Sequence, residues 1–169
     1  MAKALFIKTS DIVKKTSLSG SVDSNKFLQY VEVAQEIHVQ NLLGTDLYDR
    51  ISSDIIAGTL EGDYKNLVEE YIKPILINYG MVEYLGFAQY EISNAGIYKH
   101  RIEASETASK EEVDYLVGKH KNYADYYSDR LIEYLCTNDT RSKFPEYYTN
   151  TDDDIRPDKQ VTYTSWNLK

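Results

Sequence analysis

The sequence predicts an all-α protein: a helical bundle of about four main helices over residues 1–149, followed by an extended C-terminal arm over residues 150–169. Two observations support this prediction. Apolar residues recur three and four positions apart over several long stretches, which is the period of an amphipathic helix. Glycines and capping residues separate those stretches, where helices end and begin. A length of 169 residues suits one domain with its own core.

The first half of the chain contains two predicted helices after an irregular lead-in over residues 1–22, in which a short helix begins near Thr9. Residues 24–43 have helical periodicity, and Gly44 is placed to end that helix with a left-handed residue. A shorter helix then begins at Thr45 and is stopped by Gly58.

The third main helix is expected from about residue 63 to residue 93. Pro74 has no N–H to donate to Glu70, so a kink is expected there. Beyond Pro74 the helix is apolar nearly all round, which places it at the centre of the bundle. Gly80 and Gly86 lower its helix propensity, so we expect them to permit close approach of a neighbouring helix.

Residues 93–108 interrupt the helical pattern with a strand-like alternation, which predicts an extended loop or small hairpin between the last two long helices. Ser109 and Glu112 have the spacing of a capping box, and the last helix is expected to run to about Cys136, a small buried residue in this interpretation. Its predicted buried stripe comprises Val113, Leu116, His120, Tyr123, Ala124, Tyr127, Leu131, Tyr134 and Leu135. The aromatic stretch at 144–148 is expected to fold back on the bundle.

Composition and charge exclude several classes of protein. The formal net charge of −8 argues against stable binding of nucleic acid, which requires a basic face, although an acidic passage would let DNA slide through. The most apolar stretch, residues 75–90, contains polar residues and is too short to span a membrane. The N-terminal sequence has no signal-peptide h-region, and a single cysteine fits a reducing compartment.

Catalytic and metal-binding motifs are not evident in the sequence. It contains neither a P-loop nor a nucleophile elbow, and its three histidines are too scattered for a zinc pattern, so we expect no enzyme activity and no cofactor. His38 and His120 are expected to be packed or hydrogen-bonded. Glu83 is the best candidate for a perturbed carboxylate, but we expect the simpler alternative, that it faces solvent or pairs with a Lys or Arg.

Tyrosine is unusually frequent, with 16 residues, more than one bundle core needs. A tyrosine combines apolar area with a polar tip, which suits surfaces that are buried against another protein. An aromatic-rich core with hydroxyls that reach water is the alternative, and both hold if Tyr71 and Tyr127 are core residues while Tyr126 lies at an interface.

The arm after residue 150 lacks helical periodicity and contains Pro157, so it is either a frayed end or a segment that becomes ordered on a partner. Together with the 93–108 excursion and the 144–148 stretch, it supplies the candidate partner-binding residues. These are Tyr98, Lys99, His100, Arg101, Tyr147, Tyr148, Arg156, Val161, Tyr163 and Trp166.

Three stretches resemble a known family. "FLQYVEVAQEIHVQNLLGTDLYDRI" (27–51) resembles the helix–"LGxxLY"–helix opening of phage head–tail connector, or adaptor, proteins, in particular those of crAss-like phages. "YIKPILINYGMVEYLGFAQYEISNAG" (71–96) resembles their central helix and the segment after it. "SKEEVDYLVGKHKNYADYYSDRLIEYL" (109–135) resembles their last helix.

This resemblance implies a structural protein of the virion, assembled in the host cytoplasm into a ring of twelve copies at the head–tail junction. It implies contacts with other copies, with the portal protein and with further tail or ring proteins, and only transient passage of DNA. Neither an active site nor a membrane contact is implied. A small helical regulatory or protein-binding module without catalytic activity is the alternative, because it would share every feature of the bundle.

Overall fold

A computed structural model describes residues 4–15, 24–88, 90–93, 96–99, 108–137, 140–149 and 155–157. It confirms the predicted all-α bundle. The elements are α1 (Thr9–Lys15), α2 (Ser24–Ala34), the π-helical turn η1 (Gln35–Val39), α3 (Gln40–Leu43), α4 (Thr45–Ala57), α5 (Gly62–Leu67), the π-helical turn η2 (Val68–Ile72), α6 (Lys73–Leu85), β1 (Tyr90–Ser93), β2 (Gly96–Lys99), α7 (Lys110–Cys136), α8 (Thr140–Lys143) and α9 (Glu146–Thr149).

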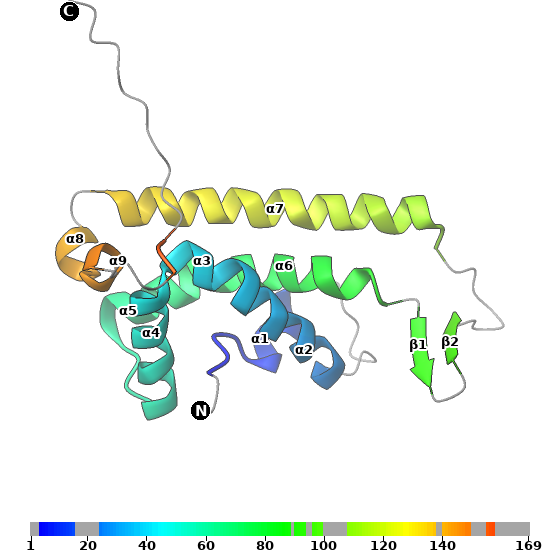
Figure 1. Cartoon of the computed structure of the whole chain (residues 1–169), viewed down its shortest axis with the longest axis horizontal. Helices are drawn as coiled ribbons and strands as arrows, with labels where there is room; N and C mark the ends of the chain where they lie inside the picture. The colour runs from blue at the N-terminus through cyan, green and yellow to red at the C-terminus, as the bar shows by residue number, and fades with distance from the viewer. Residues whose placement is uncertain are drawn as a thin grey trace, which may run out of the picture.

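Figure 1 shows α7 lying along α6, with α2 crossing the other side of α6. The β1–β2 hairpin lies at one end of the α6–α7 pair, and α8 and α9 lie at the opposite end. The first predicted helix is continuous through α2, η1 and α3. It ends at Gly44, whose φ of 75° is accessible to glycine at little cost. Gly58, with a φ of 70°, ends α4 as predicted.

The third helix comprises α5, η2 and α6, and its predicted end at residue 93 is wrong. α6 ends at Leu85, and residues 90–93 instead pair antiparallel with residues 96–99, so a small hairpin is present as predicted, but it begins before the predicted excursion over 93–108. These residues leave the helix because their backbone is extended and joins a strand ladder. A π-helical turn precedes Pro74, in which the Lys73 N–H bonds to the Val68 carbonyl, so the wide turn accommodates a proline that donates no hydrogen bond.

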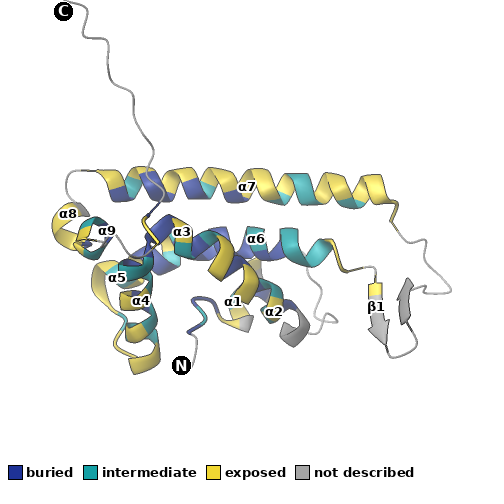
Figure 2. Cartoon of the chain, viewed as in Figure 1, coloured by how far each residue is buried: buried dark blue, intermediate teal, exposed yellow. Residues whose placement is uncertain are grey.

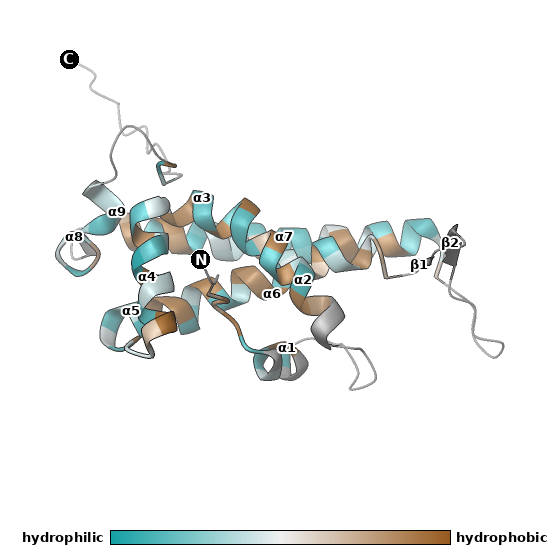
Figure 3. Ribbon diagram, turned by 60° about the horizontal axis from the view of Figure 1, so that its bottom comes forward, coloured by the Kyte–Doolittle hydropathy of each residue, from teal (hydrophilic) through white to brown (hydrophobic). Residues whose placement is uncertain are grey.

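Helix α6 lies at the centre of the bundle, as its apolar sequence predicts (Figure 3). Gly80 faces α2, and a Cβ atom there would lie 3.0 Å from Val31 Cγ2 and 3.3 Å from Phe27 Cζ. The close approach predicted for Gly80 is therefore confirmed. For Gly86 the same prediction is wrong, because a Cβ atom there would meet nothing nearer than a carbonyl at 3.8 Å.

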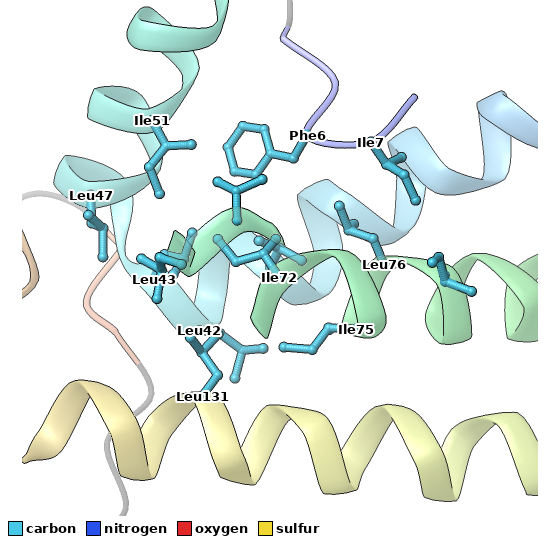
Figure 4. Close-up of a cluster of buried hydrophobic side chains, with 14 of the residues drawn as sticks. Phe6, Ile7, Leu42, Leu43, Leu47, Ile51, Ile72, Ile75, Leu76 and Leu131 are labelled. Carbon is cyan, nitrogen blue, oxygen red and sulfur yellow. The ribbon is translucent and has the colours of Figure 1, made fainter. Parts of the chain in front are cut away.

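The core is built from η2, α6 and the helices around them (Figures 2 and 4). The N-terminal lead-in also contributes to it, since Phe6 and Ile7 are buried among Leu43, Ile51 and Leu76. Gln35, in the buried face of η1, fixes this segment. Its side-chain amide accepts from the Phe6 N–H at 2.9 Å and donates to the Ala4 carbonyl at 2.8 Å.

Helix α7 begins with the predicted capping box, in which Ser109 and Glu112 exchange hydrogen bonds of 2.8 and 3.2 Å. Its C-terminal half is buried as predicted around Leu131. The prediction is wrong for Leu116 and Tyr123, which are exposed. α6 ends at Leu85, and the first turns of α7 extend past that end (Figure 1), so the side chains there have little core to pack against. Tyr123 lies beside α6, but it is about 100° round the helix from buried Ala124 and faces away from the core.

The chain then folds back on the bundle through α8 and α9, as the aromatic stretch predicts. Phe144 and Tyr147 are fully buried, and the Tyr148 hydroxyl donates to the Leu135 carbonyl. Cys136 is exposed, so the prediction of a buried cysteine is wrong. Cys136 follows buried Leu135 by one residue, which is about 100° of helical rotation, so its side chain points away from the core.

Candidate protein-interaction surface

The large exposed apolar side chains of α7 lie between Tyr115 and Tyr126. Four large side chains there, the α7 aromatic stripe, are 45% to 64% exposed: Tyr115, Leu116, Tyr123 and Tyr126. At about 100° per residue, the four positions fall within one sector about 100° wide, so they form one continuous face. Large aromatic side chains that the fold leaves in water are the residue types that protein interfaces favour.

Basic side chains accompany this stripe. The Lys119 ammonium lies 5.4 Å from the centre of the Tyr115 ring, and the Arg130 guanidinium lies 5.2 Å from the centre of the Tyr71 ring. Helical spacing places Lys119 and Arg130 in the same sector as Tyr126. Two acidic residues share that sector: Glu112, which is engaged in the capping box, and Glu133, three residues beyond Arg130. Between Tyr115 and Tyr126 the charged residue in the sector is Lys119, so the centre of the stripe is aromatic and positively charged.

A second exposed apolar face lies on the first long helix. Val33, Ile37 and Phe87, which follows α6, are 43% to 53% exposed, and the Phe87 ring stacks on Tyr30 with 5.7 Å between ring centres. We call these four residues the α2 apolar stripe. Exposed carboxylates border it, because Glu32 and Glu36 precede Val33 and Ile37 by one residue each.

A polar cluster connects η1, α6 and α7. The His38 ring stacks on Tyr79 with 3.6 Å between ring centres, and the Tyr79 hydroxyl donates to Asp125 at 2.8 Å. Burial, together with the bond to Asp125, raises the pKa of Tyr79 to about 12. Burial lowers the pKa of His38, although Glu83, 3.8 Å away, acts in the opposite direction. Glu83 thus faces a histidine and is partly exposed.

His120 lies along the same seam. Its Nδ1 is 3.0 Å from the Asn78 side-chain oxygen, and Asn78 in turn donates to the Pro74 carbonyl at 2.8 Å. Burial lowers the pKa of His120. Both His38 and His120 are therefore packed and partnered, as predicted. Among the residues whose placement is described, no group of three His, Cys, Asp or Glu side chains is arranged to hold a metal ion.

A small open cavity of about 280 Å³ lies between the N-terminal segment, the end of α4 and η2. Phe6, Ile55 and Val68 supply apolar walls, and Lys73 lies at its edge. Lys73 is nearly buried and bonds Asp11 at 2.8 Å and Glu69 at 2.7 Å. Burial alone would lower the pKa of Lys73, but its hydrogen bonds to the two carboxylates raise it. This ion cluster joins α1 to η2 and α6.

The structure separates the predicted partner-binding residues into three groups. Tyr147 is fully buried, so its prediction is wrong: its ring belongs to the hydrophobic core, and its hydroxyl lies 3.9 Å from Cys136 Sγ of α7. Tyr148 is half-buried, and Arg156 is exposed beside the start of α4. Tyr98 and Lys99 lie in β2, where the structure describes only the backbone. The remaining predicted residues lie outside the described part of the chain: His100, Arg101, Val161, Tyr163 and Trp166.

Tyr71 and Tyr127 pack against the core, as predicted, and Tyr126 is exposed. The position of Tyr126 at an interface stays a prediction. Sequence reasoning missed Tyr115 as a surface residue. A signal was available, because Tyr115 and Tyr126 are eleven residues apart, lie at nearly the same angle on the helix, and both fall outside the predicted buried stripe.

These observations define an all-α bundle protein with two exposed apolar faces and a partnered polar seam. In the part of the chain that the structure describes, no helix combines the length and apolar character needed to cross a membrane. A family of unknown function, DUF6712, matches residues 39–156, and the chain belongs to this family. No curated protein and no solved structure matches the chain.

Proposed function

We propose that this chain is a structural virion protein, a head–tail connector (adaptor) that forms a ring between the portal and the tail of a tailed phage, with an acidic passage for DNA. The observation that carries the proposal is the α7 aromatic stripe, a surface suited to burial against another protein. The resemblance of residues 27–51, 71–96 and 109–135 to connector proteins supplies the identity of the partners.

The helical bundle itself is compatible with this role. A ring subunit needs lateral contacts with its neighbours, contacts with the portal above and with tail proteins below, and closed head-to-tail rings satisfy the symmetry rules for oligomers. Segments outside the predicted helices are suited to the axial contacts. The excursion over 93–108 would contact a neighbouring subunit or the portal, and Tyr163 and Trp166 of the arm would dock on an adjacent ring protein.

The passage of DNA requires a surface that does not bind the duplex. With a net charge of −8, we expect no salt-dependent, sub-micromolar binding of duplex DNA at physiological ionic strength. Fluorescence anisotropy with a labelled duplex measures this directly. Tight binding that weakens steeply with salt would contradict the connector and favour a nucleic-acid-binding protein.

The decisive experiment combines the chain with the portal protein of the same genome and images the mixture by cryo-electron microscopy. The connector proposal expects a ring coaxial with the portal, and mass spectrometry should detect the chain in purified virions. The position of its gene among portal, capsid and tail genes gives an independent check. A chain that binds no portal and is absent from virions would instead be a regulatory or protein-binding module.

A further inference from the structure

The two exposed stripes lie on opposite sides of the α6–α7 pair. The α2–η1–α3 helix lies against the Asp125 side of α7, because Asp125 accepts from Tyr79 and Tyr79 stacks on His38 of η1. Tyr123 precedes Asp125 by two residues, which is about 200° of helical rotation, so it projects from the opposite side of α7. A molecule with two different apolar faces on opposite sides is suited to head-to-tail association.

The two faces are also complementary in charge. Glu32 and Glu36 border the α2 apolar stripe, four residues apart and therefore on the same edge of their helix. The α7 aromatic stripe instead carries Lys119 at its centre. Each stripe would repel a copy of itself at these positions and attract the other, so charge favours contact between unlike faces over a symmetric dimer.

We infer that the α2 apolar stripe of one copy packs against the α7 aromatic stripe of the next copy. Tyr30, Val33, Ile37 and Phe87 of one subunit meet Tyr115, Leu116, Tyr123 and Tyr126 of its neighbour. Glu32 and Glu36 face Lys119 of the other stripe. This inference rests on the proposed function, because it names the lateral contact of the proposed ring, and its occupant is a second copy of this chain.

The first test places a charge in each face of the full-length chain. Ile37→Asp disables the α2 face and Tyr126→Asp disables the α7 face, and both side chains are at least half exposed, so neither change disturbs the core. Sedimentation velocity at rising protein concentration should show that each variant alone loses self-association, with at least a tenfold weaker affinity, about the loss of one interface anchor. Ile56→Asp is the matched control, an equally exposed apolar residue on α4 that lies in neither stripe.

Mixing the two variants distinguishes this contact from every symmetric alternative. An Ile37→Asp chain and a Tyr126→Asp chain share one intact pair of faces, so the mixture should form dimers and nothing larger. If either variant assembles like the wild type, or if the mixture stays monomeric while the wild type associates, the inference is overturned. It is also overturned if the wild type remains monomeric at millimolar concentration and on the portal.

A second pair of variants reverses charges, and here mixing should restore full assembly rather than stop at dimers. Glu32→Lys/Glu36→Lys and Lys119→Glu should each weaken self-association, because each creates like charges across the contact. The mixture of these two proteins pairs opposite charges at both contacts, so full assembly should return. If rings form on the portal equally well with all variants, the lateral contact lies elsewhere while the connector function stands. If the mixtures behave as expected but no variant binds a portal, the contact stands and the connector function fails.

Discussion

At the scale of single residues, Gly80 is the position where the smallest change should have a large effect. A methyl group there would lie 3.0 Å from Val31 Cγ2, between two helices that both belong to the core. We expect Gly80→Ala to lower the free energy of unfolding by about 1–3 kcal/mol, the usual cost of overpacking. Urea denaturation measures this difference.

The control for this prediction is a glycine with space around it. Gly118 lies in α7, and no neighbouring side chain lies within 4 Å of the place that a methyl group would take, so Gly118→Ala gains helix propensity without a clash. We expect it to raise the free energy of unfolding by about 0.5–1 kcal/mol. Equal effects of the two alanine substitutions would contradict the tight contact between α6 and α2.

The buried Lys73 predicts how stability depends on pH. Burial raises the pKa of Asp11, but the hydrogen bond and charge of Lys73 outweigh it, and the pKa is lowered below 3.8. The folded state therefore binds this proton more weakly than the unfolded chain. The stabilisation is present above the unfolded pKa and is lost as pH falls through the lower folded pKa.

Asp11→Asn should lower the free energy of unfolding by about 1–2 kcal/mol at neutral pH, because it removes a charge-assisted hydrogen bond from a nearly buried ammonium. Between about pH 5 and about pH 2 the wild type should lose stability more steeply than the variant. Denaturation curves across this range test both statements. Glu133→Gln, an exposed position on α7, serves as control, and a variant as pH-sensitive as the wild type would rule out the Asp11 contribution.

At the scale of elements, local chemistry explains what the sequence could predict. Helices end at Gly44 and Gly58 because of the backbone conformation of glycine, and α7 begins after Ser109 because of side-chain capping. Both effects depend on a few neighbouring residues. The end of α6 does not, because residues 90–93 join a strand ladder with residues 96–99 rather than follow their helical spacing. The π-helical turns likewise have no local sequence signature.

The candidate surface, too, could be predicted from the sequence only in part. Tyrosine enrichment predicted that an interface exists, and Tyr126 was assigned to it, but Tyr147 was assigned there too and is fully buried. Composition cannot distinguish these positions, because the path of α8 and α9 decides which ring enters the core. Tyr123 is a surface residue because it lies about 100° round the helix from buried Ala124 and so projects away from the core.

The N-terminal half of α7 should depend on its capping box more than the C-terminal half does, because few buried contacts hold it. We expect Ser109→Ala to destabilise these first turns by about 1 kcal/mol and to speed their amide exchange about fivefold. Exchange around Leu131 should stay unchanged, since that region is fixed by the core. Ser109→Asp retains a capping oxygen and should exchange like the wild type. Uniformly faster exchange along α7 would mean that the helix unfolds as one unit.

At the scale of the whole molecule, part of the predicted arm returns to the bundle. The Ile155 carbonyl accepts from the Thr45 N–H at 3.0 Å, and Pro157 is buried. The first N–H groups of a helix have no partner within the helix, so this carbonyl satisfies one of them at the start of α4. The family match, which extends to residue 156, includes this contact. The predicted boundary at residue 149 therefore separates the helices from a segment that still touches them.

Two truncations distinguish the part of the arm that stabilises the fold from the part proposed to bind partners. Removing everything after Thr149 takes away the acceptor for Thr45, so the free energy of unfolding should fall by about 0.5–2 kcal/mol. The melting temperature should then fall by about 2–4 °C for each kcal/mol lost. Removing only residues after Pro157 keeps that hydrogen bond and should leave the melting temperature unchanged. Under the proposed function both proteins lack Val161, Tyr163 and Trp166, so both should fail to attach to the adjacent ring or tail protein. If the protein that ends at Pro157 melts as low as the one that ends at Thr149, residues 158–169 belong to the folded domain. If the protein that ends at Pro157 attaches normally, residues 158–169 are not the partner-binding arm.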